Sequence, residues 1–365
     1  MSQAPLTIRN IRTRPVLIPI RRPPQSASGA IPVAPLVLVD LETHEGVTGH
    51  AYVFAFAPWA LAPLVQCFAG ALEIIRDANV APLELAQTLK SRLRLMDTPG
   101  LVGIALAGID MAAWDAQARA QSQPLARLLG SGLKAIPSYN SCGLWIAPAD
   151  GLADEASALL EEGGFSAVKL RVGRAESKHD VQAVENVRNR IGLDIELMVD
   201  YNQSLRTHGA ITRGKALEEY NLSWIEEPIA HENYAGYAKI KAALNTPIQT
   251  GENLLDTNKL AQALAYDSLD LVMPDVQRIG GVTGWLKAAA LAEAHDIPMS
   301  SHLFPEISQH LLAATPSAHW LEYMDWANPI LQQPIAITNG TAQIPDRPGS
   351  GVEWDETAVA QYLVE

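Results

Sequence analysis

The chain has 365 residues, of which 48% are hydrophobic, and it carries a formal net charge of -13 at pH 7. This length exceeds one ordinary domain and suits a barrel with a second domain. The negative charge argues against nucleic acid and anionic membranes as partners. No stretch approaches the roughly 20 apolar residues of a membrane span, and we identify no signal peptide. The two cysteines, Cys67 and Cys142, lack zinc-binding spacing, so we expect reduced thiols and a cytoplasmic protein.

The first third of the chain predicts strands followed by helices. Residues 8–20 and 35–41 are expected to be strands. Residues 21–32 between them are rich in Pro, Ser, Ala and Gly, which is typical of a mobile flap over a site, although a solvated hairpin loop without function is the alternative. Residues 60–129 are expected to be helical, with small residues at helical spacing over 105–115 that favour close packing. A glycine-containing turn near 130–135 marks the predicted domain boundary.

The middle of the chain alternates between strand and helix patterns. Helical segments such as 180–190 and 285–295 separate the strands. Eight strands are predicted, of which the last is the weakest: residues 136–141, 167–172, 196–202, 224–227, 247–252, 271–275, 298–302 and 319–324. Alternation of this kind with this count predicts a closed parallel barrel. The pattern stops after Asp325, residues 335–344 read as a final strand pair, and we expect the tail to return to the first domain.

Three of the predicted strands end in acidic residues at a regular interval. Asp200, Glu226 and Glu252 lie 26 residues apart (226 minus 200, and 252 minus 226). The carboxyl ends of parallel barrel strands meet at one rim, so these side chains should converge. Three hard oxygen ligands predict a site for a Mg²⁺-like ion with positions left for a substrate carboxylate.

Other strand ends carry further polar residues. Lys169 and Arg171 are two residues apart and should share a face of their strand. Asp275, His302 and Glu322 end later strands. Taken alone, each of these residues could have an ordinary structural role, as part of a salt bridge, as a turn residue or as a structural histidine. Together at one rim of the barrel, they predict an active site. Lys169 would neutralise charge on a substrate carboxylate.

Asp275 and His302 come from neighbouring strands, so a carboxylate–imidazole hydrogen bond is plausible. It would orient His302 as a base near neutral pH. Glu322 would donate a proton if apolar walls raise its pKa.

These residues lie in long ordered motifs: KLR, MVDYNQS, WIEEP, GEN, PDVQRIGGVTGW, SSHLF and HLLAATPSAHWLE, with APLVLVDL, GHAYVFAF and AGIDMAAWDA before them and IPDRPGSG after. The set resembles the mandelate racemase group of the enolase superfamily over nearly the whole chain. The resemblance implies an α+β capping domain over residues 1–130, to which a tail over 330–365 returns, and a (β/α)₇β barrel over 131–329. It also implies a homo-oligomer, either an octamer or a dimer.

For the site, the resemblance implies one Mg²⁺ on the three acids, a His302–Asp275 base and Glu322 as the acid. It places Lys169 and Ser141 near the substrate carboxylate, with Asn202 beside them. Racemases of this group carry Lys, a second base, where this chain has Arg171, and guanidinium is a poor proton acceptor.

Two enzyme activities therefore stay open. The overall similarity of the sequence to the mandelate racemase group favours a racemase or epimerase of a 2-hydroxy carboxylate. Arg171 favours an acid-sugar dehydratase that uses His302 as its single base. A non-catalytic protein that binds metal and carboxylate is the third alternative, against which the presence of Asp275, His302 and Glu322 argues. Residues 23–32 differ from the flap of the group, so substrate specificity does not carry over.

Overall fold

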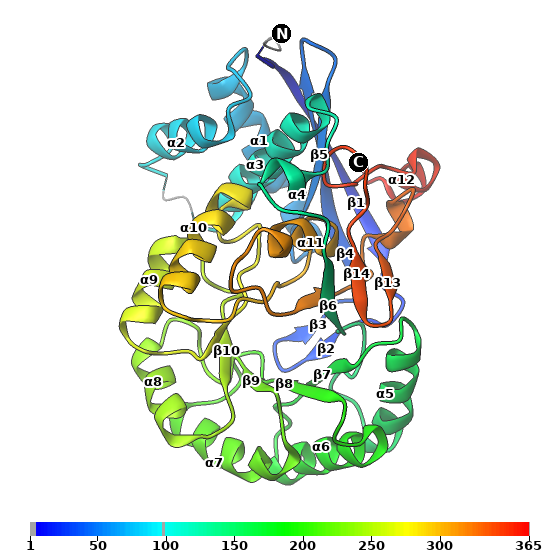
Figure 1. The fold of residues 1–365 in the computed structure, drawn as a ribbon, viewed down its shortest axis with the longest axis vertical. Coiled ribbons are helices and arrows are strands. Elements are labelled where there is room, and N and C mark those ends of the chain that lie inside the picture. The colour runs from blue at the N-terminus through cyan, green and yellow to red at the C-terminus, as the bar shows by residue number, and fades with distance from the viewer. Residues whose placement is uncertain (1–4, 97–98, 365) are drawn as a thin grey trace.

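The computed structural model describes residues 5–96 and 99–364. The chain begins with an antiparallel sheet of order β1-β4-β5, built from β1 (Ile8–Pro19), β4 (Val33–Thr43) and β5 (Thr48–Phe54). A small hairpin, β2 (Gln25–Ser26) and β3 (Gly29–Ala30), lies within the predicted flap. Figure 1 places this hairpin below the sheet, close to β7 and β8 of the barrel.

Helices α1 (Leu61–Ile75), α2 (Pro82–Arg92), α3 (Leu101–Ala120) and α4 (Leu125–Leu128) follow, after a 3₁₀ turn η1 (Pro58–Ala60). The predicted close packing of α3 is confirmed where α3 meets β5. A Cβ on Gly49 would lie 2.0 Å from the carbonyl oxygen of Ala112, so only glycine fits there. Residues 58–75 are long and apolar enough to cross a membrane by length and composition alone. The buried residues of α1 pack in the core of the first domain, as core helices of globular proteins do.

The predicted barrel is confirmed, with helices around its strands (Figure 1). The first three repeating units are β6 (Ala135–Asn140) with η2 (Ala149–Gly151) and α5 (Leu152–Glu161), β7 (Ala167–Arg171) with α6 (Ser177–Ile191), and β8 (Glu196–Asp200) with α7 (Thr207–Leu217) and η3 (Glu218–Tyr220). The next three are β9 (Trp224–Glu226) with α8 (Tyr234–Ala243), β10 (Ile248–Thr250) with α9 (Thr257–Ala265), and β11 (Leu271–Val272) with α10 (Gly281–Ala294). The last part consists of α11 (Pro305–Ala313), β12 (Leu321–Tyr323) and η4 (Asn328–Ile330). Parallel pairing runs from β11 to β6, and β12 pairs with β6.

One predicted strand is not a regular strand. Residues 298–302 form isolated bridges instead, including Val272↔Met299 and Asp275↔His302. The Val272 N–H donates to the Pro298 carbonyl at 3.1 Å, and the Ser300 N–H donates to the Val272 carbonyl at 2.8 Å. Pro298 has no N–H to donate, which interrupts the ladder at its first residue. The segment still closes the barrel and brings His302 beside Asp275.

The tail after the barrel contacts both parts of the molecule. The predicted final strand pair is confirmed as β13 (Ala336–Thr338) and β14 (Thr341–Gln343), and β14 pairs antiparallel with β6. Further on, the Trp354 indole donates to Asp40 at 2.6 Å, and α12 (Glu356–Tyr362) lies against β1. The tail therefore ties the first sheet to the barrel. The boundaries 1–130, 131–329 and 330–365 stay a prediction.

Candidate active site

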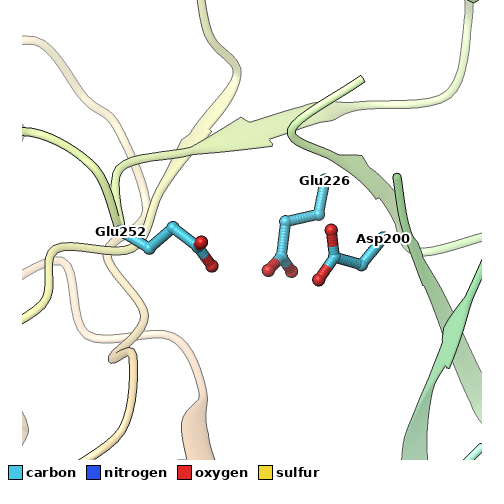
Figure 2. A group of neighbouring side chains, drawn as sticks. All are labelled: Asp200, Glu226 and Glu252. Atoms are coloured by element: carbon cyan, nitrogen blue, oxygen red, sulfur yellow. The ribbon is translucent and has the colours of Figure 1, made fainter. Parts of the chain in front are cut away.

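Three acidic side chains meet at the carboxyl ends of neighbouring barrel strands. Asp200 ends β8, Glu226 ends β9, and Glu252 follows β10 by two residues. One carboxylate oxygen from each lies within 4.8 Å of the others, and Figure 2 shows the carboxylates turned toward one another. Gly251 allows this placement of Glu252, because a Cβ there would lie 2.7 Å from the Met273 backbone nitrogen. The structure brings together the three predicted ligands.

The charge on this trio suits a cation. Burial raises the pKa of Glu226 to about 8, with Asp200 and Glu252 adding to the rise and Lys169 opposing it. Burial and the same two carboxylates also raise the pKa of the neighbouring Glu227. Buried carboxylates held this close repel one another unless a positive charge lies between them. Three hard oxygen donors in this arrangement fit Mg²⁺, which prefers oxygen ligands.

Lys169, on β7, is a buried cation between two acids. Its ammonium nitrogen lies 2.7 Å from a Glu226 oxygen and 2.8 Å from a Glu322 oxygen, and its side chain is 1% exposed. Burial lowers the pKa of Lys169, but Glu226 and Glu322 outweigh burial and raise it. Lys169 therefore carries a positive charge at the mouth of the barrel.

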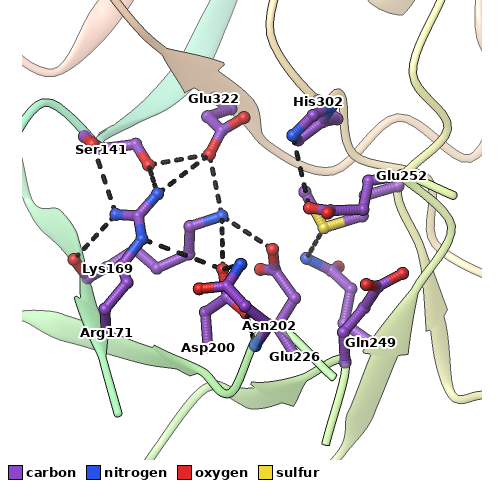
Figure 3. Close-up of polar contacts among 12 residues, drawn as sticks. Ser141, Lys169, Arg171, Asp200, Asn202, Glu226, Gln249, Glu252, His302 and Glu322 are labelled. Atoms are coloured by element: carbon purple, nitrogen blue, oxygen red, sulfur yellow. Dashed lines mark hydrogen bonds and ion pairs between the residues drawn. The ribbon is translucent and has the colours of Figure 1, made fainter. Parts of the chain in front are cut away.

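Arg171 lies beside Lys169, and Figure 3 shows both side chains reaching into the same space. The guanidinium donates to the Ser141 hydroxyl at 2.9 Å and lies 3.8 Å from Asp200 and 4.0 Å from Glu322. Its central carbon lies over the Trp145 ring, 4.1 Å from the ring centroid. Arg171 thus adds a second fixed positive charge to the site.

Glu322, on β12, accepts hydrogen bonds from the Ser141 hydroxyl at 2.7 Å and from the Leu303 N–H at 2.9 Å. Burial raises its pKa, but Lys169, His302 and Arg171 outweigh burial and hold the pKa well below its usual range. The condition under which Glu322 would donate a proton, a raised pKa, is therefore not met, because the ammonium of Lys169 lies 2.8 Å away. Glu322 is an ionised carboxylate in this arrangement.

Each ring nitrogen of His302 faces a carboxylate. Nδ1 lies 2.8 Å from Asp275 Oδ2, and Nε2 lies 3.3 Å from Glu252 Oε2. Asp275 is itself held by the N–H of Gln277 at 2.8 Å. Burial lowers the pKa of His302, but Glu252 and Asp275, with Glu322, outweigh it and raise the pKa to about 9. A cation on Glu252 would cancel the largest of these contributions and favour the neutral ring, which is the basic form.

Ser141 and Asn202 complete the predicted set. Ser141 bridges Arg171 and Glu322 through its hydroxyl. The Asn202 side chain donates to Asp200 at 2.9 Å and its backbone N–H donates to the same carboxylate at 2.7 Å. Asn202 has a left-handed backbone, with φ of 42°, which turns the chain back toward Asp200. In this structure Asn202 therefore holds the orientation of Asp200.

Several residues near the site were not predicted. Glu227 accepts from the Asn253 side chain at 2.7 Å, and its position directly after Glu226, the last residue of β9, could have signalled it. The Gln249 amide contacts the Met273 sulfur at 3.2 Å. Trp145 lies in a loop, where neither strand periodicity nor acid spacing points to it.

The predicted flap rests on loops that follow the barrel strands. The Ile146 N–H donates to the Gln25 carbonyl at 2.7 Å, and the Ser28 hydroxyl donates to the Asn202 carbonyl at 3.0 Å. Arg22 pairs with Glu162 through both terminal nitrogens of its guanidinium. The flap thus lies across the side of the mouth that carries Arg171 and Asp200.

A small apolar cavity lies next to the charged residues. Tyr52 and Phe54 from β5 meet Leu303, Phe304 and Trp326 around a cavity of about 20 Å³. This cavity adjoins the charged residues, because Leu303 directly follows His302 and donates to Glu322.

A parallel barrel whose rim carries an acid trio, a histidine–aspartate pair and buried cations defines an enzyme site that acts on a carboxylate. Comparison with known families agrees. Residues 8–130 match the mandelate racemase / muconate lactonizing enzyme N-terminal domain, and residues 151–358 match the enolase C-terminal domain-like family. The chain belongs to the mandelate racemase group of the enolase superfamily, as its motifs had indicated.

Known relatives include lyases and magnesium-bound structures. The chain is 35% identical over 260 residues to an L-talarate/galactarate dehydratase of Salmonella typhimurium, across 71% of this chain and 65% of that enzyme. It is 42% identical to an enolase from alpha proteobacterium bal199 with bound magnesium, at a TM-score of 0.96, covering 98% and 100% of the two chains. It is 38% identical to a Bradyrhizobium enolase complexed with magnesium and mandelic acid, at a TM-score of 0.95, over the whole of both chains.

Proposed function

We propose that the protein is a Mg²⁺-dependent enzyme that removes the proton α to the carboxylate of a 2-hydroxy acid, as a racemase or epimerase. The main support for this proposal is that the His302–Asp275 pair lies beside Glu252, one of the three acids. A base is thereby adjacent to the metal site where a substrate carboxylate would bind. Mg²⁺ held by Asp200, Glu226 and Glu252 would neutralise charge on that carboxylate and make the adjacent C–H more acidic.

The protein's own residues have separate roles in this proposal. Asp275 accepts a hydrogen bond from Nδ1 of His302, and Nε2, which faces Glu252, would take the α-proton. The charges of Lys169 and Arg171 stabilise the negative charge that develops on the substrate oxygens. Ser141 and Glu322 hold these two cations in place through hydrogen bonds and the ion pair to Lys169.

Tyr52, Phe54 and Trp326 form an aromatic wall of the small cavity next to the site, and from this wall we infer a substrate whose substituent at C2 is apolar. A polyhydroxylated chain against this wall would lose hydrogen bonds to water without replacing them. The relative complexed with mandelic acid supports the same choice, since mandelic acid is a 2-hydroxy acid with an aryl group. We therefore place an aryl or alkyl 2-hydroxy carboxylate ahead of a sugar acid.

Acid-sugar dehydration is the second candidate, and Arg171 is the observation that favours it. Stacked on Trp145 and bonded to Ser141, this guanidinium is fixed as a donor and is poorly suited to accept a proton. A reaction that needs only one base, His302, accommodates that constraint. The talarate/galactarate dehydratase relative is consistent with this alternative.

A screen of aryl 2-hydroxy acids and sugar acids with Mg²⁺ in D₂O separates the candidates. A racemase or epimerase incorporates deuterium at C2 and changes optical rotation, whereas a dehydratase yields a keto acid. The absence of both α-proton exchange and keto-acid formation with every member of both classes would contradict enolisation. A keto acid formed only from sugar acids would replace the first candidate by the second.

We further propose that the protein is a cytoplasmic homo-oligomer, an octamer or a dimer. Large apolar side chains lie on the surface of the first domain: Trp59, Leu83, Leu95 and Met96 are 59% to 92% exposed. Exposed large apolar side chains on one domain are consistent with a surface that another subunit covers. Sedimentation equilibrium tests this proposal, and a monomer at micromolar concentration would refute it.

A further inference from the structure

Trp145 is placed between the flap and Arg171. It lies in the loop after β6 and is 9% exposed. One face of its ring carries the Arg171 guanidinium, 4.1 Å from the ring centroid. Its indole N–H donates to the Arg22 carbonyl at the start of the flap, at 3.0 Å. A single rigid side chain thus contacts both a cation of the site and the segment that covers it.

The loop backbone fixes this placement. Leu144 has a left-handed conformation, with φ of 53°, and its carbonyl accepts the N–H of Arg171 at 2.9 Å. Two residues further on, the Ile146 N–H donates to the Gln25 carbonyl of the flap at 2.7 Å. The loop is therefore bonded on one side to β7 and on the other to the flap. Trp145 is held between these two attachments.

The guanidinium depends on its neighbours for position. It donates to the Ser141 hydroxyl and to the carbonyls of Ser141, Gly143 and Lys169 at 2.9 to 3.5 Å. Its Nε is buried and has no hydrogen-bond partner among the described residues. Cation–π stacking on an indole is strongest when the cation is desolvated, so the ring is a substantial part of what restrains this cation.

We propose that Trp145 is a positioning residue that orients Arg171 and links that orientation to docking of the flap. When the flap is docked, the Arg22 carbonyl holds the indole and the indole holds the guanidinium toward Ser141 and the substrate carboxylate. When the flap lifts, the indole loses that hydrogen bond and the guanidinium loses part of its restraint. The inference rests on the proposed function for the role of Arg171, and it adds a residue that acts through Arg171 without contacting the reacting atoms.

Two substitutions separate the two contacts. Trp145→Phe keeps an aromatic face but removes the indole N–H, so KM should rise with kcat within about twofold of the wild type. Trp145→Leu removes both contacts and should lower kcat roughly tenfold, in line with the loss of a buried cation–π contact. Trp354→Leu is the matched control, because Trp354 is also buried, donates to Asp40 and has Arg14 5.9 Å from its ring. It should leave the kcat of folded protein unchanged.

A double-mutant cycle with Arg171→Met tests whether Trp145 acts through Arg171. In that background Trp145→Leu should cost less than about twofold, since the partner of the ring is gone. If Arg171→Met leaves no measurable turnover, the cycle is measured on the dissociation constant of 2-hydroxy-2-phenylpropanoate, which has no α-proton and binds without reacting. Equal losses in both backgrounds would overturn the proposal and assign Trp145 a structural role only.

Amide hydrogen exchange tests the link to the flap without using activity. Residues 21–33 should exchange faster in Trp145→Phe and faster still in Trp145→Leu than in the wild type or Trp354→Leu. Unchanged exchange across these residues would refute the link. If the wild type enolises no carboxylate, the proposed function fails, whereas this measurement still decides whether Trp145 restrains the flap.

Discussion

Replacing Glu306 with Gln should stabilise the protein at alkaline pH. Glu306 lies at the start of α11, is 3% exposed, and accepts the Tyr52 hydroxyl at 2.5 Å. Its other carboxylate oxygen is buried and has no partner among the described residues. Burial raises the pKa of Glu306 from 4.5 to about 7, and the hydrogen bond from Tyr52 only partly opposes this.

The raised pKa of Glu306 determines how the stability of the protein changes with pH. The folded state holds the Glu306 proton to higher pH than the unfolded state, so stability falls as pH rises from about 4.5 to 7. A rise of about 2.5 pKa units (7 minus 4.5) at about 1.36 kcal/mol per unit gives about 3 kcal/mol lost above pH 7. Glutamine has no charge to bury and still accepts the Tyr52 hydroxyl. It therefore avoids most of this loss.

Urea unfolding at pH 5 and pH 8 measures the effect. Glu306→Gln should raise the urea midpoint relative to the wild type at pH 8 and differ little at pH 5. Glu84→Gln, on the exposed first turn of α2, is the matched control and should give the same midpoint as the wild type at both values. An equal difference between Glu306→Gln and the wild type at both pH values would refute the reasoning.

The remaining predictions concern the site. His302→Asn should lower α-proton exchange by about 10² to 10⁴-fold while Mn²⁺ still binds, and near-normal exchange would contradict its role as the base. Glu226→Gln should weaken Mn²⁺ binding measured by calorimetry, and anomalous diffraction from Mn²⁺ away from Asp200 and Glu252 would sink the metal assignment. Deuterium should enter one configuration of an accepted substrate faster than the other, and Arg171→Lys should speed the slow one. Rapid exchange of both by the wild type would show that a second base is present. Exchanging residues 21–33 for the flap of a relative should change substrate preference more than metal affinity, and an unchanged substrate profile would count against specificity in the flap.

Much of the fold and the assembly of the site followed from local patterns. Apolar runs that end in acid every 26 residues predicted a barrel with Asp200, Glu226 and Glu252 at one rim, because parallel strands present their carboxyl ends on the same side. The spacing of Lys169 and Arg171 predicted a shared face, since side chains two apart on a strand point the same way. The composition of residues 21–32 indicated a flap, and the structure lays that segment on the barrel loops.

Other properties depended on groups that are distant in the sequence. The low pKa of Glu322 comes mainly from Lys169, which lies five strands earlier along the chain but 2.8 Å away in the closed barrel. Trp145 meets Arg171 only because a left-handed residue turns its loop back over β7. Strand periodicity fixes which residues reach the rim, whereas electrostatic shifts and loop contacts depend on three-dimensional distances that only the closed barrel sets.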